Sequence, residues 1–192
     1  MIQLQTGRLC IRDYVFDDFE SYFSLYSNKK VVYYYPDGYL RTAAEAKKQF
    51  DAILKEIDTA ERQRYYFCIR GKDNGSFIGE IGYSIIESTP MGKLVGVGYF
   101  LLPEYWGLGY ATEAFKEVIR FAFEENHVFR IKAGCLKENA GSEKVMMKCG
   151  MIKEADFKCS TWHDGQIKDS SSYRLLKAEW EARNINNHPS QT

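Results

Sequence analysis

The sequence has no excess of charge of either sign and no long hydrophobic run. Its 192 residues contain 26 Lys plus Arg and 26 Asp plus Glu, so the formal net charge is zero when His is neutral. An even balance gives no field that would attract nucleic acid or an anionic membrane. No apolar stretch approaches the roughly 20 residues of a membrane span, and the first residues lack the pattern of a signal peptide. We therefore expect a cytoplasmic protein without nucleic-acid or membrane partners.

Cysteine pairs and histidines are also scarce. The five cysteines are widely spaced without a Cys-x-x-Cys pair, and there are only three histidines. This usage favours free thiols over disulfides or a metal site, so no metal is expected. The length suits a single domain, which we place at residues 1–183. Residues 184–192 are predicted to be a disordered end of the charged tail that starts at Lys177.

Hydrophobic periodicity predicts alternating strands and helices. Strand patterns occupy residues 8–12, 65–70, 77–86, 94–102 and 130–135, with a closing hairpin at 152–162 and 167–176. Helix patterns occupy residues 16–26, 42–57, 111–123 and 139–150. Hairpin turns make neighbouring strands antiparallel, whereas the helix at 111–123 should leave strands 94–102 and 130–135 parallel. The pattern therefore predicts a mixed, mostly antiparallel sheet.

Residues 98–114 combine the end of a strand, a glycine loop and the start of a helix. Gly107 and Gly109 lie in the loop, where free backbone N–H groups and the helix dipole converge on one point. A phosphate suits such a point. A dinucleotide-binding oxidoreductase would need a third glycine, where Thr112 stands, and an acidic residue in the next strand, where 129–135 has none.

The loop resembles the acetyl-CoA loop of the GNAT superfamily of N-acetyltransferases. That loop has the pattern Gln/Arg-x-x-Gly-x-Gly/Ala, and Trp106-x-x-Gly109-x-Ala111 matches its form with an aromatic first residue. The longer string from Pro103 to Ala114 resembles the RimJ/RimL-type branch, which acetylates the N-termini of ribosomal proteins. The resemblance covers about residues 6–178.

A second signature lies further along the chain. Asn139-x-x-Ser142, followed by Lys148-x-Gly150, is similar to the Asn-x-x-Ser and Lys-x-Gly-Phe elements of the same superfamily. The resemblance implies an α/β (α+β) fold with a sheet of about seven strands and helices on both faces. The sheet is expected to splay at its parallel pair of strands.

The resemblance implies an enzyme that transfers acetyl from acetyl-CoA to a primary amine, by direct attack in a ternary complex. The amine could be a protein N-terminus or a small molecule, and the residues do not choose between them. Homodimers are common in the resembled branch. The alternative from another class is an acyl-CoA-binding module that senses without turnover.

The resemblance also assigns residues to acetyl-CoA. Backbone groups of the loop would hold the pyrophosphate, strand residues before it would bond pantetheine and supply an oxyanion donor, Asn139 would bond pantetheine, and Lys144 would meet the adenosine phosphate. The expected cofactor-binding residues are Phe100, Leu101, Leu102, Trp106, Gly107, Leu108, Gly109, Tyr110, Ala111, Thr112, Asn139 and Lys144.

Glu80 is the first candidate for the general base. It lies inside a strand pattern between glycines, where a carboxylate is costly unless it faces a cleft or solvent. Glu104 is the second candidate. Many relatives carry a Tyr that protonates the leaving thiolate, but Met146 stands there, so Ser142, Tyr105 or water would substitute.

Three consecutive tyrosines, Tyr33, Tyr34 and Tyr35, are candidates for contacting the acceptor. In the resembled family, the segment between the first two helices forms one wall of the acceptor cleft. The alternative is that these side chains pack that segment onto the core.

Overall fold

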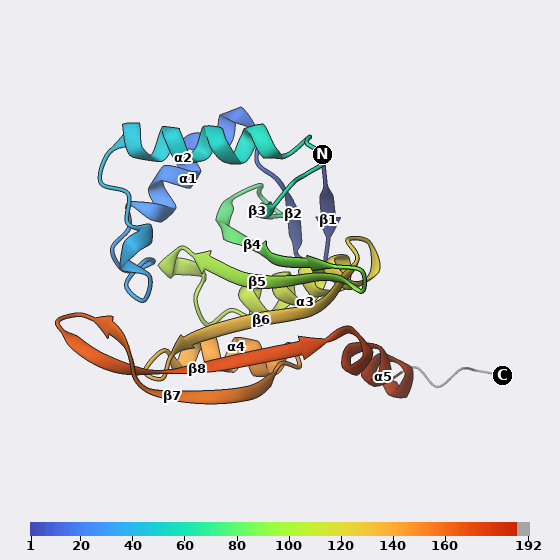
Figure 1. Cartoon of the computed structure of the whole chain (residues 1–192). Coiled ribbons are helices and arrows are strands. Elements are labelled where there is room, and N and C mark those ends of the chain that lie inside the picture. The colour runs from blue at the N-terminus through green and yellow to red at the C-terminus, as the bar shows by residue number, and fades with distance from the viewer. Residues whose placement is uncertain (188–192) are drawn as a thin grey trace. The chain divides into compact units, whose positions relative to one another are not determined.

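The computed structural model describes residues 1–187, with side chains through residue 183. Within these residues, eight strands form one sheet in the order β1-β2-β3-β4-β5-β6-β8-β7 (Figure 1). Strands β5 and β6 pair in parallel, while β1/β2, β2/β3, β3/β4, β6/β8 and β7/β8 are antiparallel. The predicted mixed α/β fold with one parallel pair is confirmed.

The elements alternate along the chain much as the periodicity predicts. The strands are β1 (Gln3–Gln5), β2 (Leu9–Asp13), β3 (Arg64–Gly71), β4 (Phe77–Thr89), β5 (Gly92–Leu101), β6 (Val128–Leu136), β7 (Ile152–His163) and β8 (Gln166–Leu176). The α-helices are α1 (Phe19–Tyr26), α2 (Ala43–Glu56), α3 (Tyr110–Glu124), α4 (Ala140–Lys148) and α5 (Lys177–Asn187). Short 3-10 turns occupy Phe16–Asp18, Pro36–Gly38 and Pro103–Tyr105.

The predicted helix ends are confirmed in detail. The Thr42 hydroxyl accepts a hydrogen bond from the Glu45 N–H, and the Glu45 carboxylate accepts one from the Thr42 N–H, which completes the capping box of α2. Helix α4 ends in a Schellman motif, in which Gly150 takes a φ of +82° and Met151 donates its N–H to Met146.

Two elements differ from the expectation. Strand β1 adds an eighth strand by pairing Gln3–Gln5 with β2. The charged segment after Lys177 is helix α5 rather than a tail, because Trp180 packs against Phe123 at 5.6 Å between ring centroids. Helix α5 includes residues 184–187 of the predicted disordered segment, and residues 188–192 lie outside the described part of the chain.

The chain forms two compact units. The first contains Met1–Ser84 and Val97–Val118, and the second contains Ile85–Gly96 and the chain from Ile119 onward. Strands β4 and β5 and helix α3 each contribute residues to both units. That the whole chain acts as one domain stays a prediction.

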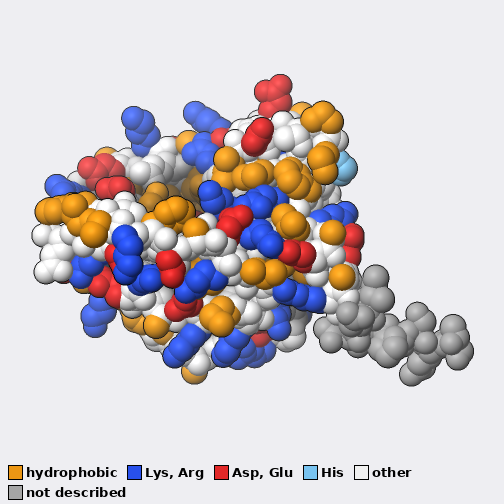
Figure 2. Space-filling model, turned by 60° about the horizontal axis from the view of Figure 1, so that its bottom comes forward, with side chains coloured by type: hydrophobic (Ala, Val, Ile, Leu, Met, Phe, Trp, Pro, Cys, Tyr) orange, Lys and Arg blue, Asp and Glu red, His pale blue; other side chains and the backbone are white. Residues whose placement is uncertain are grey.

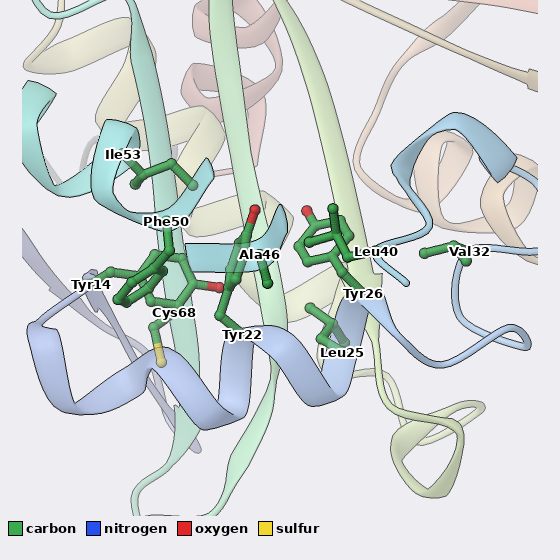
Figure 3. Close-up of a cluster of buried hydrophobic side chains, with 10 residues drawn as sticks. All are labelled: Tyr14, Tyr22, Leu25, Tyr26, Val32, Leu40, Ala46, Phe50, Ile53 and Cys68. Carbon is green, nitrogen blue, oxygen red and sulfur yellow. The ribbon is translucent and has the colours of Figure 1, made fainter. Parts of the chain in front are cut away.

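In the first unit, α1 and α2 cover an aromatic core (Figure 3). Phe50 of α2 is fully buried, and its ring centroid lies 5.1 Å from Tyr22, 5.4 Å from Tyr14 and 5.7 Å from Phe19. Aromatic pairs at these separations add to the stabilisation that burial itself provides. The two helices are therefore fixed on the sheet by ring contacts.

Helix α3 covers the opposite face of the same strands. Consecutive residues of a strand point to opposite faces, and Tyr99 and Phe100 contact different helices. The Phe100 ring lies 5.4 Å from Tyr26 of α1, whereas the Tyr99 ring lies 5.7 Å from Phe115 of α3. The expectation of helices on both faces is thus confirmed for the first unit.

The second unit is built on the β6-β8-β7 part of the sheet. Asp164 and Gly165 both take positive φ angles, 49° and 71°, in the two-residue turn of the β7–β8 hairpin. Helices α4 and α5 contact β6, and α5 also contacts β8. On the face shown in Figure 2, Lys and Arg side chains are interspersed with Asp and Glu.

No helix in the described part of the chain is long and apolar enough to span a membrane.

Replacing Phe50 by Ala tests the aromatic core. The change opens a cavity among α1, α2 and β3, so we expect the free energy of unfolding to fall by about 3–5 kcal/mol. Phe16→Ala is the matched control, because Phe16 is 67% exposed and should cost less than about 1 kcal/mol. Urea denaturation measures both. Equal losses would show that the core is not centred on Phe50.

Candidate functional site

The loop between β5 and α3 holds two glycines in the left-handed region. The φ angles are +76° at Gly107 and +83° at Gly109. Within the described structure, a Cβ at Gly107 would meet nothing within 4 Å, and one at Gly109 would meet only Arg8 Nη2, at 3.5 Å. Glycine is required by the backbone conformation rather than by crowding. The loop therefore leaves open space beside its backbone.

The N–H groups after this loop suit an anion. The first hydrogen bond of α3 runs from the Glu113 N–H to the Gly109 carbonyl at 3.0 Å. The N–H groups of Tyr110 and Ala111 precede that bond and so have no acceptor inside the helix. Together with the helix dipole they form an anion-binding terminus that fits a diphosphate.

Trp106 ties the loop back to β5. Its backbone N–H donates to the Pro103 carbonyl at 3.2 Å, within a 3-10 turn. Its indole Nε1–H donates to the Leu101 carbonyl at 2.7 Å. The sequence predicts that the Trp106 N–H faces a pyrophosphate, but the structure gives this group another partner. The Trp106 N–H is therefore not available as a donor to an anion.

The end of β5 presents one backbone donor away from β4. The Leu102 N–H donates to the Ile78 carbonyl of β4 at 3.0 Å. Because consecutive N–H groups of an extended strand point to opposite edges, the Leu101 N–H points away from β4. Of the three predicted residues Phe100, Leu101 and Leu102, only Leu101 therefore presents its backbone N–H on the edge of β5 that faces away from β4.

The N-terminal segment holds the glycine loop from outside. The Glu113 carboxylate accepts hydrogen bonds from the Thr6 hydroxyl at 2.5 Å, the Arg8 N–H at 2.9 Å and Arg8 Nε at 2.7 Å. Arg8 Nη1 also donates to the Leu108 carbonyl at 3.1 Å, and the guanidinium lies 4.2 Å from the Tyr110 ring centroid. Burial raises the pKa of Glu113, but these hydrogen bonds outweigh it and leave the pKa below its usual value.

The sequence pattern places Arg8 in a strand and predicts no contact for it. A signal is nevertheless present, because the segment from Pro103 to Phe115 contains no Lys or Arg. Any basic side chain beside this loop must therefore come from another part of the chain, as Arg8 does.

Glu80 is buried between two tyrosines. Only 5% of its surface is exposed. Tyr14 donates its hydroxyl to Oε2 at 2.8 Å, and Tyr26 donates to Oε1 at 2.6 Å. Desolvation raises the pKa of Glu80 to about 7, while the hydrogen bonds from Tyr26 and Tyr14 work to lower it. Glu80 is therefore poised to gain or lose a proton near neutral pH.

Both tyrosines keep their protons in this setting. Burial, followed by the nearby Glu80 charge, raises the pKa of Tyr14 and of Tyr26 well above the ordinary value. Each hydroxyl is thus a donor to the carboxylate throughout the physiological range.

The glycines beside Glu80 have a packing role. A Cβ at Gly79 would lie 2.1 Å from the Phe100 carbonyl oxygen, and one at Gly82 would lie 2.2 Å from the Tyr65 carbonyl oxygen. Close approach of β5 and β3 therefore requires glycine at these positions. Glu80 does not face solvent, because its carboxylate is buried and accepts hydrogen bonds from two tyrosine hydroxyls.

The three linker tyrosines lie partly in solvent. Tyr33, Tyr34 and Tyr35 are 44%, 40% and 52% exposed, whereas Val32 is buried and joins the core. The Tyr35 ring lies 5.8 Å from Phe100, which in turn contacts Tyr26. Val32 and Leu40 thus anchor the linker in the core, and contact of the tyrosines with an acceptor stays a prediction.

The remaining predicted residues have the following local settings. Glu104 is exposed in the 3-10 turn before the glycine loop. In the second unit, Asn139 caps α4 by accepting the Ser142 N–H at 3.1 Å, and Lys144 is exposed. Met146 is buried and carries no proton donor. The roles expected for Asn139, Ser142 and Lys144 stay predictions.

In the described residues, no group of three or more His, Cys, Asp or Glu side chains could hold a metal ion, and none of the five cysteines is in a disulfide.

Glu80 should make stability depend on pH. A carboxyl whose folded pKa is raised to about 7 binds more protons folded than unfolded, so its contribution to stability falls as pH rises from about 4.5 to 7. One pKa unit corresponds to about 1.4 kcal/mol. We therefore expect Glu80→Gln to gain about 3 kcal/mol relative to the parent between pH 4 and pH 8.

Urea denaturation of both proteins across that range measures the difference. A difference that does not change with pH would contradict the raised pKa.

Comparisons with known proteins agree with this geometry. A family model described as an acetyltransferase (GNAT) domain matches residues 8–152. The uncharacterized N-acetyltransferase YnaD of Bacillus subtilis is 30% identical over 179 residues, which cover 93% of this chain and 99% of YnaD. This relationship extends over nearly the full length of both proteins.

Two solved structures share the fold. Ribosomal-protein-S5-alanine acetyltransferase from Vibrio fischeri has a TM-score of 0.79 at 22% identity and covers 94% of this chain and 99% of its own. Spermidine N-acetyltransferase from Vibrio cholerae, in complex with CoA and spermine, has a TM-score of 0.79 at 15% identity and covers 92% and 99%. The family match includes the glycine loop, Glu80 and Asn139. The chain therefore belongs to the GNAT family of acetyl-CoA-dependent N-acetyltransferases, which act on amines.

Proposed function

We propose that this N-acetyltransferase acts on a primary α-amine, either a protein N-terminus or a small molecule, with Glu80 as general base. The observation that carries the proposal is the buried Glu80 carboxylate with a pKa of about 7, held by two tyrosine hydroxyls. A base is most effective when its pKa lies near the working pH.

The pKa of Glu80 suits an α-amine better than a lysine-type amine. An α-amine has a pKa of about 7.7–8.0, less than about one unit above that of Glu80, whereas a lysine amine has a pKa of about 10.4. Moving a proton from a lysine-type amine to Glu80 would be uphill by more than about 4 kcal/mol. The proton affinity of this base therefore favours α-amines.

Tyr26 provides the proton path. Glu80 is nearly inaccessible, but Tyr26 bonds its Oε1 and also packs against Phe100 next to Leu101. Before the amine attacks, a proton of its ammonium form passes to the Tyr26 oxygen while the Tyr26 proton passes to Glu80, which leaves a neutral amine as the nucleophile. The net transfer is from amine to carboxylate, and the tyrosine ends as it began.

The donor side of the reaction uses backbone groups. Acetyl-CoA supplies an acetyl thioester when bound. The N–H groups from Gly107 to Ala111 suit its diphosphate, and the Leu101 N–H is the donor for the thioester oxygen as negative charge develops there. A backbone donor fixed by the strand needs no rearrangement during the reaction.

One of the three carboxylates around the start of α1 is not available to a polycationic acceptor, whereas Asp17 and Glu20 are exposed. Of the carboxylates at Asp17, Asp18 and Glu20, Asp18 is buried and paired with Arg12 at 2.6 Å and Arg70 at 2.8 Å. An arginine-paired carboxylate is not available to a second cation. The aromatic surface of Tyr33–Tyr35 instead suits an amine that carries an apolar neighbour, as a peptide N-terminus does, and a RimJ/RimL-like role fits this preference.

One observation supports a second candidate. Met146 cannot donate a proton to a leaving thiolate, so the chain could bind acyl-CoA as a sensor without turning it over. The proton would otherwise come from Ser142, Tyr105 or water. The assay below separates the two candidates.

The test combines binding and thiol release. The parent protein should melt at a higher temperature with acetyl-CoA, since ligand at 100 times its dissociation constant adds about 2.7 kcal/mol of stability. It should release free thiol with N-terminal peptides or small α-amines faster than with spermidine or N-acetylated peptides. Glu80→Gln should keep the acetyl-CoA affinity and lose about 100-fold or more in turnover.

Binding without thiol release for any amine would favour the sensor. No melting shift at all would contradict the acetyl-CoA site, and unchanged turnover in Glu80→Gln would remove Glu80 from the mechanism.

Tyr26→Phe and Tyr14→Phe form a matched pair. Each removes one hydrogen bond that lowers the pKa of Glu80, so the acidic limb of kcat/KM should move up by about one pH unit in both. The limb moves to higher pH because Glu80 is active only when it is deprotonated. Only Tyr26→Phe should also lower the plateau rate, because Tyr26 contacts Phe100 next to Leu101, whereas Tyr14 packs against Tyr22 and Phe50. Equal plateaus would contradict the relay through Tyr26.

A further inference from the structure

We infer that Arg8, from the N-terminal end of the sheet, binds the diphosphate of acetyl-CoA and supplies the positive charge that the glycine loop lacks. The inference rests on the proposed use of residues 107–111 as the diphosphate site. It assigns a cofactor contact to a residue outside the loop.

The loop itself has the wrong charge for a diphosphate. Between Pro103 and Phe115 there are two glutamates, Glu104 and Glu113, and no Lys or Arg. The first position of the loop pattern, where Gln or Arg is usual, holds Trp106, whose indole bonds the Leu101 carbonyl. Backbone N–H groups alone would thus face a dianion next to the Glu113 carboxylate.

Arg8 lies where the missing cation is needed. Its Nε is held by Glu113, its Nη1 by the Leu108 carbonyl and its plane by the Tyr110 ring. Nη2 carries two further N–H groups and lies 3.5 Å from the position that a Cβ of Gly109 would take. The guanidinium is therefore oriented by three partners with Nη2 beside the open side of the loop.

The geometry also explains an acidic residue in the first turn of α3. Glu113 is ionised, since its pKa lies below the usual value, and it would repel a diphosphate if left alone. Paired with Arg8 it instead holds the guanidinium, which suits bidentate and charge-assisted recognition of phosphate oxygens. Arg8 is half-exposed, so a ligand can reach it.

The test compares donors with and without phosphates. In Arg8→Ala, the dissociation constant for CoA by titration calorimetry should rise about 10-fold or more, the range for a lost charge-assisted hydrogen bond. The kcat/KM for S-acetylpantetheine, which carries no diphosphate, should stay within about 2-fold of the parent. Far-UV circular dichroism and the melting temperature confirm that the variant is folded.

The variant Glu113→Gln distinguishes direct binding of phosphate by Arg8 from a purely structural role of Arg8. If Arg8 binds phosphate, Arg8→Ala weakens CoA binding about 10-fold or more in the Glu113→Gln background as well, because the lost contact is with the ligand and not with Glu113. If Arg8 acts only as the partner of Glu113, Arg8→Ala/Glu113→Gln binds CoA as tightly as Glu113→Gln. That result would overturn the inference.

Two other outcomes also overturn it: Arg8→Ala binds CoA like the parent, or it loses S-acetylpantetheine turnover to the same extent as acetyl-CoA turnover. Failure of the parent protein to bind CoA at all would instead contradict the proposed function.

Discussion

The energetic balance at Glu80 is the constraint on which the first unit depends. Removing a carboxylate from water is costly, and two tyrosine hydroxyls offset only part of that cost, which leaves the pKa near 7. The same two tyrosines belong to the aromatic cluster around Phe50 that fixes α1 and α2 on the sheet. Tyr14 and Tyr26 therefore contribute both to the packing of the helices and to the ionisation of Glu80.

Much of the fold follows from local rules in the sequence. The capping box at Thr42, the left-handed Gly150 and the Asp164-Gly165 turn each have a backbone requirement that residue type reveals, and the structure contains all three. Strand β1 and helix α5 were not predictable in this way. A three-residue strand has too little periodicity, and the apolar contact of α5 is carried by Trp180, whose partner is distant in sequence.

The site was predictable to a lesser extent. Glycine spacing located the anion loop, because φ angles near +80° exclude other residues. Glu80 was singled out by its unusual place in a strand, but the two tyrosines that satisfy its carboxylate were not foreseen. The tyrosines that hold Glu80 could not be found, because their hydroxyls meet it across 66 and 54 residues of sequence. Long-range partners are set by topology rather than by local pattern.

The contacts of Thr6 and Arg8 with Glu113 affect the order in which the protein can fold during synthesis. These contacts join residues 107 and 105 positions apart in the chain, which makes them among the most non-local in the first unit. Contacts of such high sequence separation close large loops and form late in folding. During synthesis, Thr6 and Arg8 leave the ribosome long before Glu113 does. The glycine loop therefore lacks its contacts with Thr6 and Arg8 until Glu113 has emerged. A shorter nascent chain cannot form this part of the site.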